Sequence, residues 1–244
     1  MFGRLNYHNT LNKKIWNADG KINPRVAQIL IAMAREYIRY LGAIVGLPIS
    51  EQDIYDITIH GSLADYYYDK HSDIDLCIAV DLTELQKRIP NINTVLLFNS
   101  LTRTWKRNFI ISIFGIKVDI ILSEKQYFLN NLKINIDAFY SLVHDAWIHT
   151  PKKLDKQELK NVSNMTKKRY KTIMRQCKRL LQNKATSDEI DEYLIMLKKH
   201  RHQCQKNSVT PSVNFAFKMA RNTGIFYKLL KKSNKRATQQ FFVK

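Results

Sequence analysis

Two aspartates, Asp73 and Asp75, stand at the start of an apolar segment, IDLCIAV (74–80), which has the length and composition of a β-strand. Side chains alternate across a strand, so the two carboxylates would share one face while Ile74 points into the core. Carboxylates held side by side repel each other unless a cation lies between them. Because the candidate ligand atoms are all oxygens, this pair predicts a site for Mg²⁺ or Mn²⁺.

A second group of residues could bind phosphate beside that cation. Gly61 and Ser62 follow another strand-like segment, IYDITIH (54–60), at a point where we expect the strand to turn into a helix. Glycine lets the backbone approach a phosphate closely, the N–H groups of a helix start bind anions, and the serine hydroxyl could add a contact. Asp119 lies inside a third strand-like segment, and its carboxylate needs a metal or a basic partner if it is buried.

Each feature, taken alone, can also be explained without a functional site. An Asp-x-Asp pair occurs by chance on many surfaces, a Gly-Ser pair is common, and Asp119 could belong to an edge strand and face water. The joint pattern of strand, Gly-Ser, acidic strand and later acidic strand is more specific. It places a phosphate cradle and a metal site at one cleft, which is what a phosphoryl-type transfer requires.

At these residues the sequence resembles the nucleotidyltransferase superfamily that includes DNA polymerase β. The resemblance implies transfer of a nucleoside monophosphate from an NTP to an acceptor, with release of pyrophosphate. It implies that Asp73 and Asp75 bind both metals, that Asp119 binds the acceptor-side metal and helps to activate the acceptor hydroxyl, and that Gly61 and Ser62 hold the β- and γ-phosphates. His60 departs from the family pattern, which has a more apolar residue there.

Four further segments are similar to blocks found in nucleotidyltransferase-like proteins of large tailed bacteriophages. They are LNKKIW (11–16), INPRVAQIL (22–30), YSLVHDAWIHTP (140–151) and NFAFKMARNTGIFYKL (214–229). This resemblance would extend over most of the chain and implies a phage-encoded protein that works in the host cytoplasm.

The elements that must position these residues fall into two regions. Residues 1–151 mix strand patterns with helix patterns at 22–45 and 92–107. In the second helix we expect the inward residues to be Val95, Leu96, Leu97, Leu101 and Trp105. The segments 110–114 and 116–122 flank Gly115 and should form a hairpin or a bent strand. Residues 152–244 look helical, with Ser187 as a helix N-cap and a third helix over 212–231. We therefore expect an α/β (α+β) fold, with a mixed-sheet catalytic domain at 1–151 and a basic helical domain at 152–244.

Charge divides the chain in the same way. Residues 1–151 carry 16 basic and 15 acidic side chains, whereas residues 152–244 carry 24 and 6, which accounts for the net charge of +19. A field this one-sided favours a nucleic-acid partner, although a solvated lysine-rich surface would give the same count. The candidate nucleic-acid contacts are Lys167, Lys168, Arg169, Lys198 and Lys199.

Other residues could complete the nucleotide site. Ser72 could orient the acidic pair, and Lys218 and Arg221, which share a helix face, could reach the triphosphate or the acceptor. Tyrosines 66–68 could stack on a nucleobase, but we expect them to be helix residues that pack on the core.

The acceptor is the open question. The basic region favours RNA, such as a tRNA 3′ end, over DNA. A protein or small-molecule acceptor would keep the metal site without requiring that region, and a catalytically silent nucleic-acid-binding or virion protein is a third alternative. No apolar run is long enough to span a bilayer, the N-terminus lacks the apolar core of a secretory signal, and three cysteines without CxxC spacing indicate neither a disulfide framework nor a zinc site. We expect a cytoplasmic protein without a membrane partner.

Overall fold

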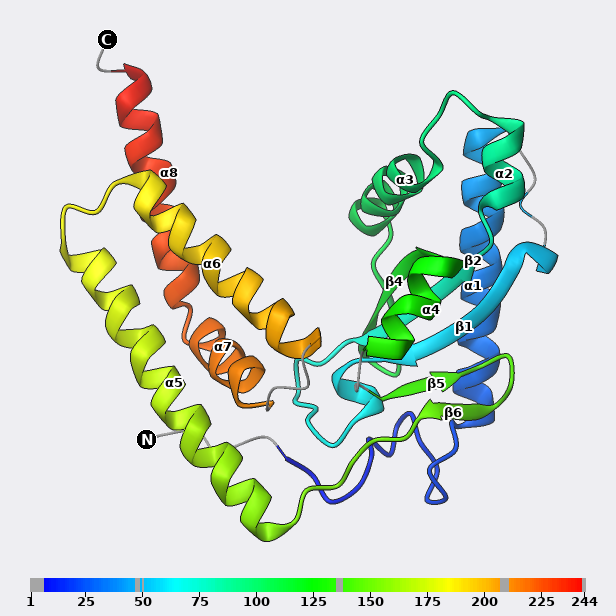
Figure 1. The fold of residues 1–244 in the computed structure, drawn as a ribbon, viewed down its shortest axis with the longest axis horizontal. Coiled ribbons are helices and arrows are strands. Elements are labelled where there is room, and N and C mark those ends of the chain that lie inside the picture. The colour runs from blue at the N-terminus through cyan, green and yellow to red at the C-terminus, as the bar shows by residue number, and fades with distance from the viewer. Residues whose placement is uncertain (1–6, 47–48, 50, 135–137, 207–210, 243–244) are drawn as a thin grey trace. The chain divides into compact units, whose positions relative to one another are not determined.

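The computed structural model describes residues 7–46, 49, 51–134, 138–206 and 211–242 of the 244-residue chain (Figure 1). Contacts divide the chain into two compact units. We call residues 6–153 the sheet unit and the residues from Leu154 onward the helical unit.

A six-stranded mixed sheet forms the centre of the sheet unit. Its strands lie in the order β3-β4-β2-β1-β5-β6. Only β2 and β4 run parallel, and every other neighbouring pair is antiparallel. The strands span Ile54–His60 (β1), Ile74–Val80 (β2), Ile111–Ile113 (β3), Ile116–Glu124 (β4), Phe139–Ser141 (β5) and Ala146–His149 (β6).

Helices cover both faces of this sheet. On one face, apolar residues of the strands pack against α1 (Pro24–Val45) and α3 (Thr94–Asn108) in the main core of the unit. On the other face, Cys77 and Ala79 of β2 pack with Phe128 of α4 (Lys125–Ile134). The remaining short helices are η1 (Glu51–Asp53), η2 (Ser62–Ala64) and α2 (Thr83–Arg88). The second face is the one that carries the acidic side chains described below.

The first helix forms where the sequence predicts it. The Asn23 side chain accepts a hydrogen bond from the backbone N–H of Arg25, and Pro24 occupies the first turn, where its missing N–H costs nothing. The helix ends at Gly46, whose left-handed conformation (φ 71°) lets its N–H bond back to the last turn.

The sequence predicts the hairpin after α3 better than it predicts the buried face of α3 itself. β3 and β4 form a hairpin, one of the two expected arrangements, and its two-residue turn has positive φ at both Phe114 and Gly115. The inward face predicted for α3 is wrong only in part: Trp105 is buried as expected, but Val95 and Leu96 are 46% and 65% exposed. The buried face consists of Thr94, Phe98, Thr102 and Trp105.

Hydrogen bonding explains why threonines can occupy that buried face. The Thr102 hydroxyl donates to the Phe98 carbonyl at 2.7 Å and lies 2.5 Å from the Tyr37 hydroxyl of α1. Burying a hydroxyl costs little when it keeps its hydrogen bonds. Apolar periodicity therefore placed Trp105 correctly but assigned Val95 and Leu96 to a face that Thr94 and Thr102 occupy.

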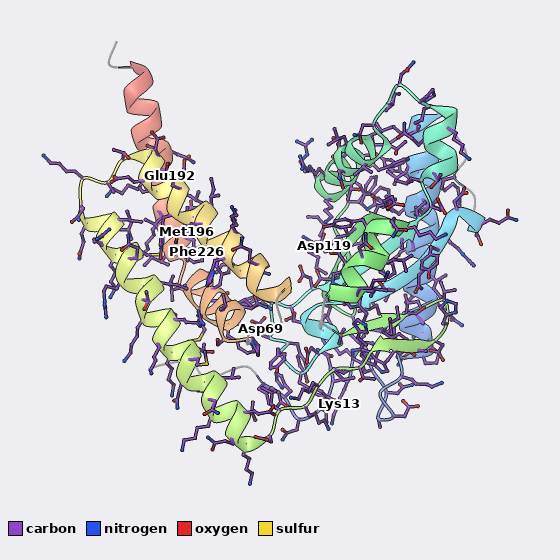
Figure 2. All side chains as sticks on the ribbon, in the orientation of Figure 1. Lys13, Asp69, Asp119, Glu192, Met196 and Phe226 are labelled. Carbon is purple, nitrogen blue, oxygen red and sulfur yellow. The ribbon has the colours of Figure 1, made fainter. Side chains whose placement is uncertain are left out.

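The helical unit contains four helices around its own core. They are α5 (Lys156–Gln182), α6 (Ser187–Lys206), α7 (Ser212–Asn222) and α8 (Ile225–Phe242). Phe217 of α7 and Phe226 of α8, the latter labelled in Figure 2, pack in this core with ring centroids 5.0 Å apart. None of the described helices is long and apolar enough to cross a membrane.

Two local predictions for the helical unit are wrong. The helix expected over 212–231 is interrupted, because Gly224 adopts a left-handed conformation (φ 73°) that ends α7 before α8 begins. Ser187 is not the N-cap of α6. The preceding Thr186 forms a reciprocal cap with Glu189, whereas the Ser187 hydroxyl is buried and donates to the Ser233 carbonyl at 2.9 Å.

Candidate metal and nucleotide site

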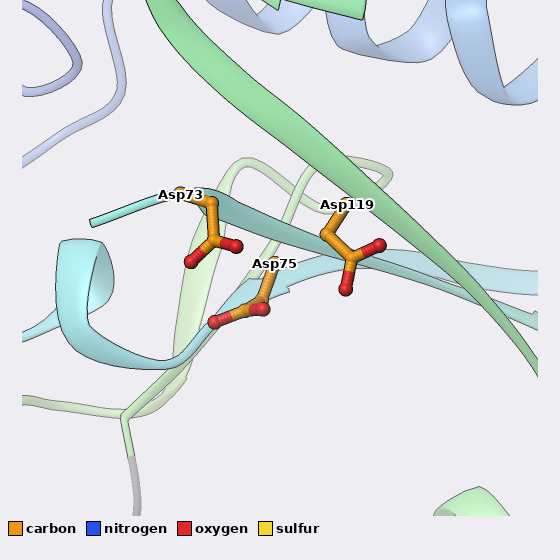
Figure 3. Close-up of side chains that lie close together, drawn as sticks. All are labelled: Asp73, Asp75 and Asp119. Carbon is orange, nitrogen blue, oxygen red and sulfur yellow. The ribbon is translucent and has the colours of Figure 1, made fainter. Parts of the chain in front are cut away.

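Three aspartates meet on two neighbouring strands of the sheet. β2 and β4 are parallel and in register, so Asp75 and Asp119 lie directly opposite each other. Asp73 precedes β2 by one residue and extends toward the same space (Figure 3). Each aspartate offers one carboxylate oxygen, and these three oxygens all lie within 4.8 Å of one another.

Strand alternation explains why the acidic side chains gather on one face. Ile74, Val118 and Ile120 are buried in the main core, on the side of α1 and α3. Their neighbours Asp75 and Asp119 must then point to the opposite face, where both are partly exposed. The apolar residues fix the register, and the register brings the carboxylates together.

Gly61 lies so close to the carboxylate of Asp75 that any side chain at this position would displace it. Its backbone adopts φ 77° and ψ −159°, a conformation found almost only in glycine. A Cβ atom placed on Gly61 would lie 2.0 Å from Asp75 Oδ2. The turn after β1 therefore requires glycine for two independent reasons, its backbone conformation and its approach to the acidic group.

Replacing Gly61 by alanine should move the Asp75 carboxylate and weaken cation binding. We expect Gly61→Ala to lower Mn²⁺ affinity and any transfer activity by about a hundredfold, because a displacement of about 1 Å is enough for such a loss. Gly20→Ala is the matched control, since Gly20 has a similar φ of 80° but nothing within 4 Å of its added Cβ. A Gly61→Ala protein that bound Mn²⁺ like the wild type would show that this contact does not shape the site.

The segment that follows Gly61 is a closed loop and not the expected helix. Only the 3₁₀ turn η2 follows Gly61, and the chain then returns to β2. The Ser62 hydroxyl donates to the Ser72 hydroxyl at 3.0 Å, and the Asp69 backbone N–H donates to Ser72 at 2.9 Å. Ser72 thereby closes the loop beside Asp73, and its expected role in orienting the acidic pair stays a prediction.

The three tyrosines of this loop pack on the N-terminal segment. Tyr68 stacks on His8 with ring centroids 3.9 Å apart, while Tyr66 and Tyr67 contact the ring of Tyr7. They lie in a loop and not in a helix, so the expected packing occurs on a different scaffold. These contacts support the packing role over base stacking.

His60, the departure from the family pattern, lies on the same face as the aspartates. It is the cross-strand partner of Asp75, so the two side chains point to the same side of the sheet. Its ring lies 5.2 Å from that of Phe139. Burial lowers the pKa of His60 to about 4, although the charge of Asp119 acts in the opposite direction. The imidazole is therefore neutral at pH 7.

A lysine that the sequence did not indicate also lies at this site. Lys106, in the last turn of α3, forms an ion pair with Asp119, with 2.7 Å between Lys106 Nζ and Asp119 Oδ1. The expectation that Asp119 needs a metal or a basic partner thus finds a basic partner. Nothing in the spacing identifies Lys106, because only the fold brings α3 to this end of β4.

The remaining candidate residues lie in the helical unit. Lys167, Lys168 and Arg169 are on α5, the first two exposed and the third partly buried. Lys198 and Lys199 are exposed on α6, and Lys218 and Arg221 lie one turn apart on α7. The structure does not bring any of them together with Asp73, Asp75 and Asp119 in one unit, and their roles stay predictions.

One family model matches part of the chain. Residues 49–144 match the family model described as "Nucleotidyltransferase domain". The matched segment runs from before β1 to after β5 and contains the three aspartates, Gly61, Ser62 and Lys106. No curated protein and no solved structure shows significant similarity to the chain. The match supports the nucleotidyltransferase superfamily and a transferase, whereas the resemblance to phage proteins stays a prediction.

Proposed function

We propose that this protein transfers a nucleoside monophosphate from an NTP to an acceptor in a reaction that depends on a divalent cation and releases pyrophosphate. The observation that carries the proposal is the convergence of three carboxylates on adjacent strands, beside a glycine turn that no other residue type could form. The family match over residues 49–144 agrees with it.

The acidic group fits a hard divalent cation. Three carboxylate oxygens within 4.8 Å of one another repel strongly without a counter-charge, and Mg²⁺ or Mn²⁺ prefers such ligands. When bound, such cations would polarise the α-phosphate and lower the pKa of the acceptor hydroxyl. We assign Asp73 and Asp75 to both cations and Asp119 to the one on the acceptor side.

The loop after β1 is our candidate for the triphosphate. Gly61 allows close approach of the backbone, and the Ser62 hydroxyl, held by Ser72, would contact the β- and γ-phosphates. A triphosphate bound in this way would place its α-phosphate toward the carboxylates. Lys218 and Arg221 are candidates for additional phosphate contacts.

We expect NTP binding to require the divalent cation. The triphosphate and the acidic group repel each other until a cation bridges them. In calorimetric titrations, NTP affinity should fall by about a hundredfold when EDTA replaces Mg²⁺. Equal affinity in both conditions would contradict a cation-bridged triphosphate and, with it, the assigned roles of Asp73 and Asp75.

The basic surface of α5 supports a nucleic-acid acceptor, with RNA favoured over DNA. Exposed basic side chains project along the length of this helix (Figure 2). They are Lys156, Lys160, Lys167, Lys168, Lys171, Arg175, Lys178 and Arg179. Residues three and four apart share a helix face, so most of them form one continuous strip that could follow a phosphate backbone.

A labelling experiment distinguishes the possible acceptors. The protein is incubated with each α-³²P-labelled NTP, Mg²⁺ or Mn²⁺, and separate fractions of RNA, DNA and protein. We expect label in RNA that survives protease and is lost with ribonuclease. Label in a protein that survives nuclease would overturn the RNA assignment and leave the metal site standing. Nucleic-acid binding without labelled product in any fraction would indicate a silent binding protein.

A further inference from the structure

The ion pair between Lys106 and Asp119 places a fixed positive charge inside the candidate metal site. Three carboxylates and one ammonium group carry a formal charge of −2, which a single divalent cation neutralises. A second cation bound at Asp119 Oδ1 would occupy the space that the ammonium group takes, 2.7 Å from this oxygen. The lysine and an acceptor-side cation therefore compete for the same carboxylate.

The position of Lys106 is determined by the packing of α3. Trp105, the preceding residue, is buried and packs edge to face against Tyr37 and Tyr40 of α1, with ring centroids 5.2 and 4.7 Å apart. The contact between Tyr37 and Thr102 holds the same turn. The last turn of α3 is thus anchored on the core, so Lys106 does not depend on a long flexible segment to reach Asp119.

The end of the β-hairpin gives the lysine access to Asp119. β3 pairs with β4 only as far as Ile111 and Val118. Asp119 is the next residue of β4, beyond the end of this ladder. α3 ends at Asn108, shortly before β3 begins, and its last turn lies at the same end.

We propose that Lys106 controls cation occupancy at Asp119. This inference rests on the proposed function, since it assumes that the three carboxylates bind metal. Without nucleotide, the protein binds one divalent cation between Asp73 and Asp75, while the Lys106 ammonium group occupies the place beside Asp119. A second cation enters only by displacing Lys106, so the lysine sets the metal concentration at which the acceptor side of the site is loaded.

A second ion pair of the same unit provides a matched control. Lys125 Nζ lies 3.1 Å from Asp81 Oδ2, and its exposure resembles that of Lys106, with 37% and 38% for the second pair against 34% and 27% for the first. Among the described residues, Asp81 belongs to no group of three acidic ligands. Removing either lysine deletes a similar pair, but only one of the two lies at the candidate site.

The test is a titration of the full-length protein with Mn²⁺ alone, followed by calorimetry and by the electron paramagnetic resonance signal of free Mn²⁺. Lys106→Met keeps the apolar stem and removes the charge, so we expect a second bound Mn²⁺ or an affinity about tenfold higher than in the wild type. Lys106→Arg and Lys125→Met should behave like the wild type. In an Asp119→Asn background, the effect of Lys106→Met should disappear, which a merely structural role would not produce.

The outcomes separate this inference from the proposed function. If the wild type and Lys106→Met bind Mn²⁺ with equal stoichiometry and affinity, or if Lys125→Met gains as much, the role of Lys106 is wrong and the metal site stands. If none of the proteins binds Mn²⁺, both proposals fail. If Lys106→Met does not fold, the Lys106→Gln variant gives the same comparison.

Discussion

Replacing Asp75 by asparagine should reduce nucleotidyl transfer by about a thousandfold or more. Asparagine has the same shape but no charge, so it cannot hold the cations on which the proposed reaction depends. Asp75 is the central residue of the acidic group, because it faces Asp119 across the strand pair and lies against the Gly61 turn. Asp73→Asn should have a loss of the same order. The measurement is incorporation of α-³²P label into the acceptor at saturating Mg²⁺ and NTP.

The fold should survive these substitutions. Asp73 and Asp75 are only partly buried, and removing one of several mutually repelling carboxylates should not lower the melting temperature of the metal-free protein. Asp81→Asn is a suitable control, because Asp81 follows β2 directly and pairs with Lys125 outside the acidic group. Full activity of Asp73→Asn or Asp75→Asn would show that the reaction takes place elsewhere.

Nucleic-acid binding by the helical unit should be strongly salt-dependent. Each phosphate that a lysine or arginine neutralises releases bound counterions. With about six engaged phosphates, affinity should fall about a thousandfold between about 50 and 200 mM salt. Reversing the charge of Lys167, Lys168 and Arg169 together should make the negative slope of log K against log salt shallower by about 3. It should also weaken binding to all nucleic-acid sequences alike.

A control with the same change in total charge separates a binding face from general electrostatics. Lys13, Arg25 and Lys133 are exposed on the sheet unit, and their triple reversal changes the net charge by the same amount. We expect that control to keep most of the salt slope, and we expect the α5 variant to keep its affinity for Mg²⁺–NTP. Equal losses in both variants, or binding that salt does not affect, would contradict an acceptor surface on α5.

The strands that carry the candidate site could be read from the sequence with accuracy. β1 and β2 begin and end at the predicted residues, the first as an alternating segment that ends before Gly61 and the second as an apolar run between Asp73 and Asp81. Strand periodicity also implied that Asp73 and Asp75 share a face. That Asp119 lies beside them depends on the parallel pairing of β2 with β4, and local periodicity does not predict which strands pair.

The wrong predictions concern positions where polar side chains determine the local structure, on the buried face of α3 and at the start of α6. Thr102 and Thr94 occupy the buried face of α3, so apolar side chains such as Leu96 were assigned to the wrong side. At α6, two adjacent hydroxyl residues could both cap the helix, and only the side chain of Glu189 identifies Thr186 as the cap. Lys106 escaped notice because a lysine in a last helical turn is usually explained by the helix dipole.

The most direct test of the central proposal compares two labels on the same nucleotide. Wild-type protein is incubated with Mg²⁺, the RNA fraction and NTP labelled with ³²P at either the α- or the γ-phosphate. Transfer of a nucleoside monophosphate predicts that the α label enters the acceptor, that the γ label leaves as pyrophosphate, and that Asp75→Asn produces neither product. Entry of the γ label into the acceptor, or release of γ-phosphate alone, would contradict nucleotidyl transfer.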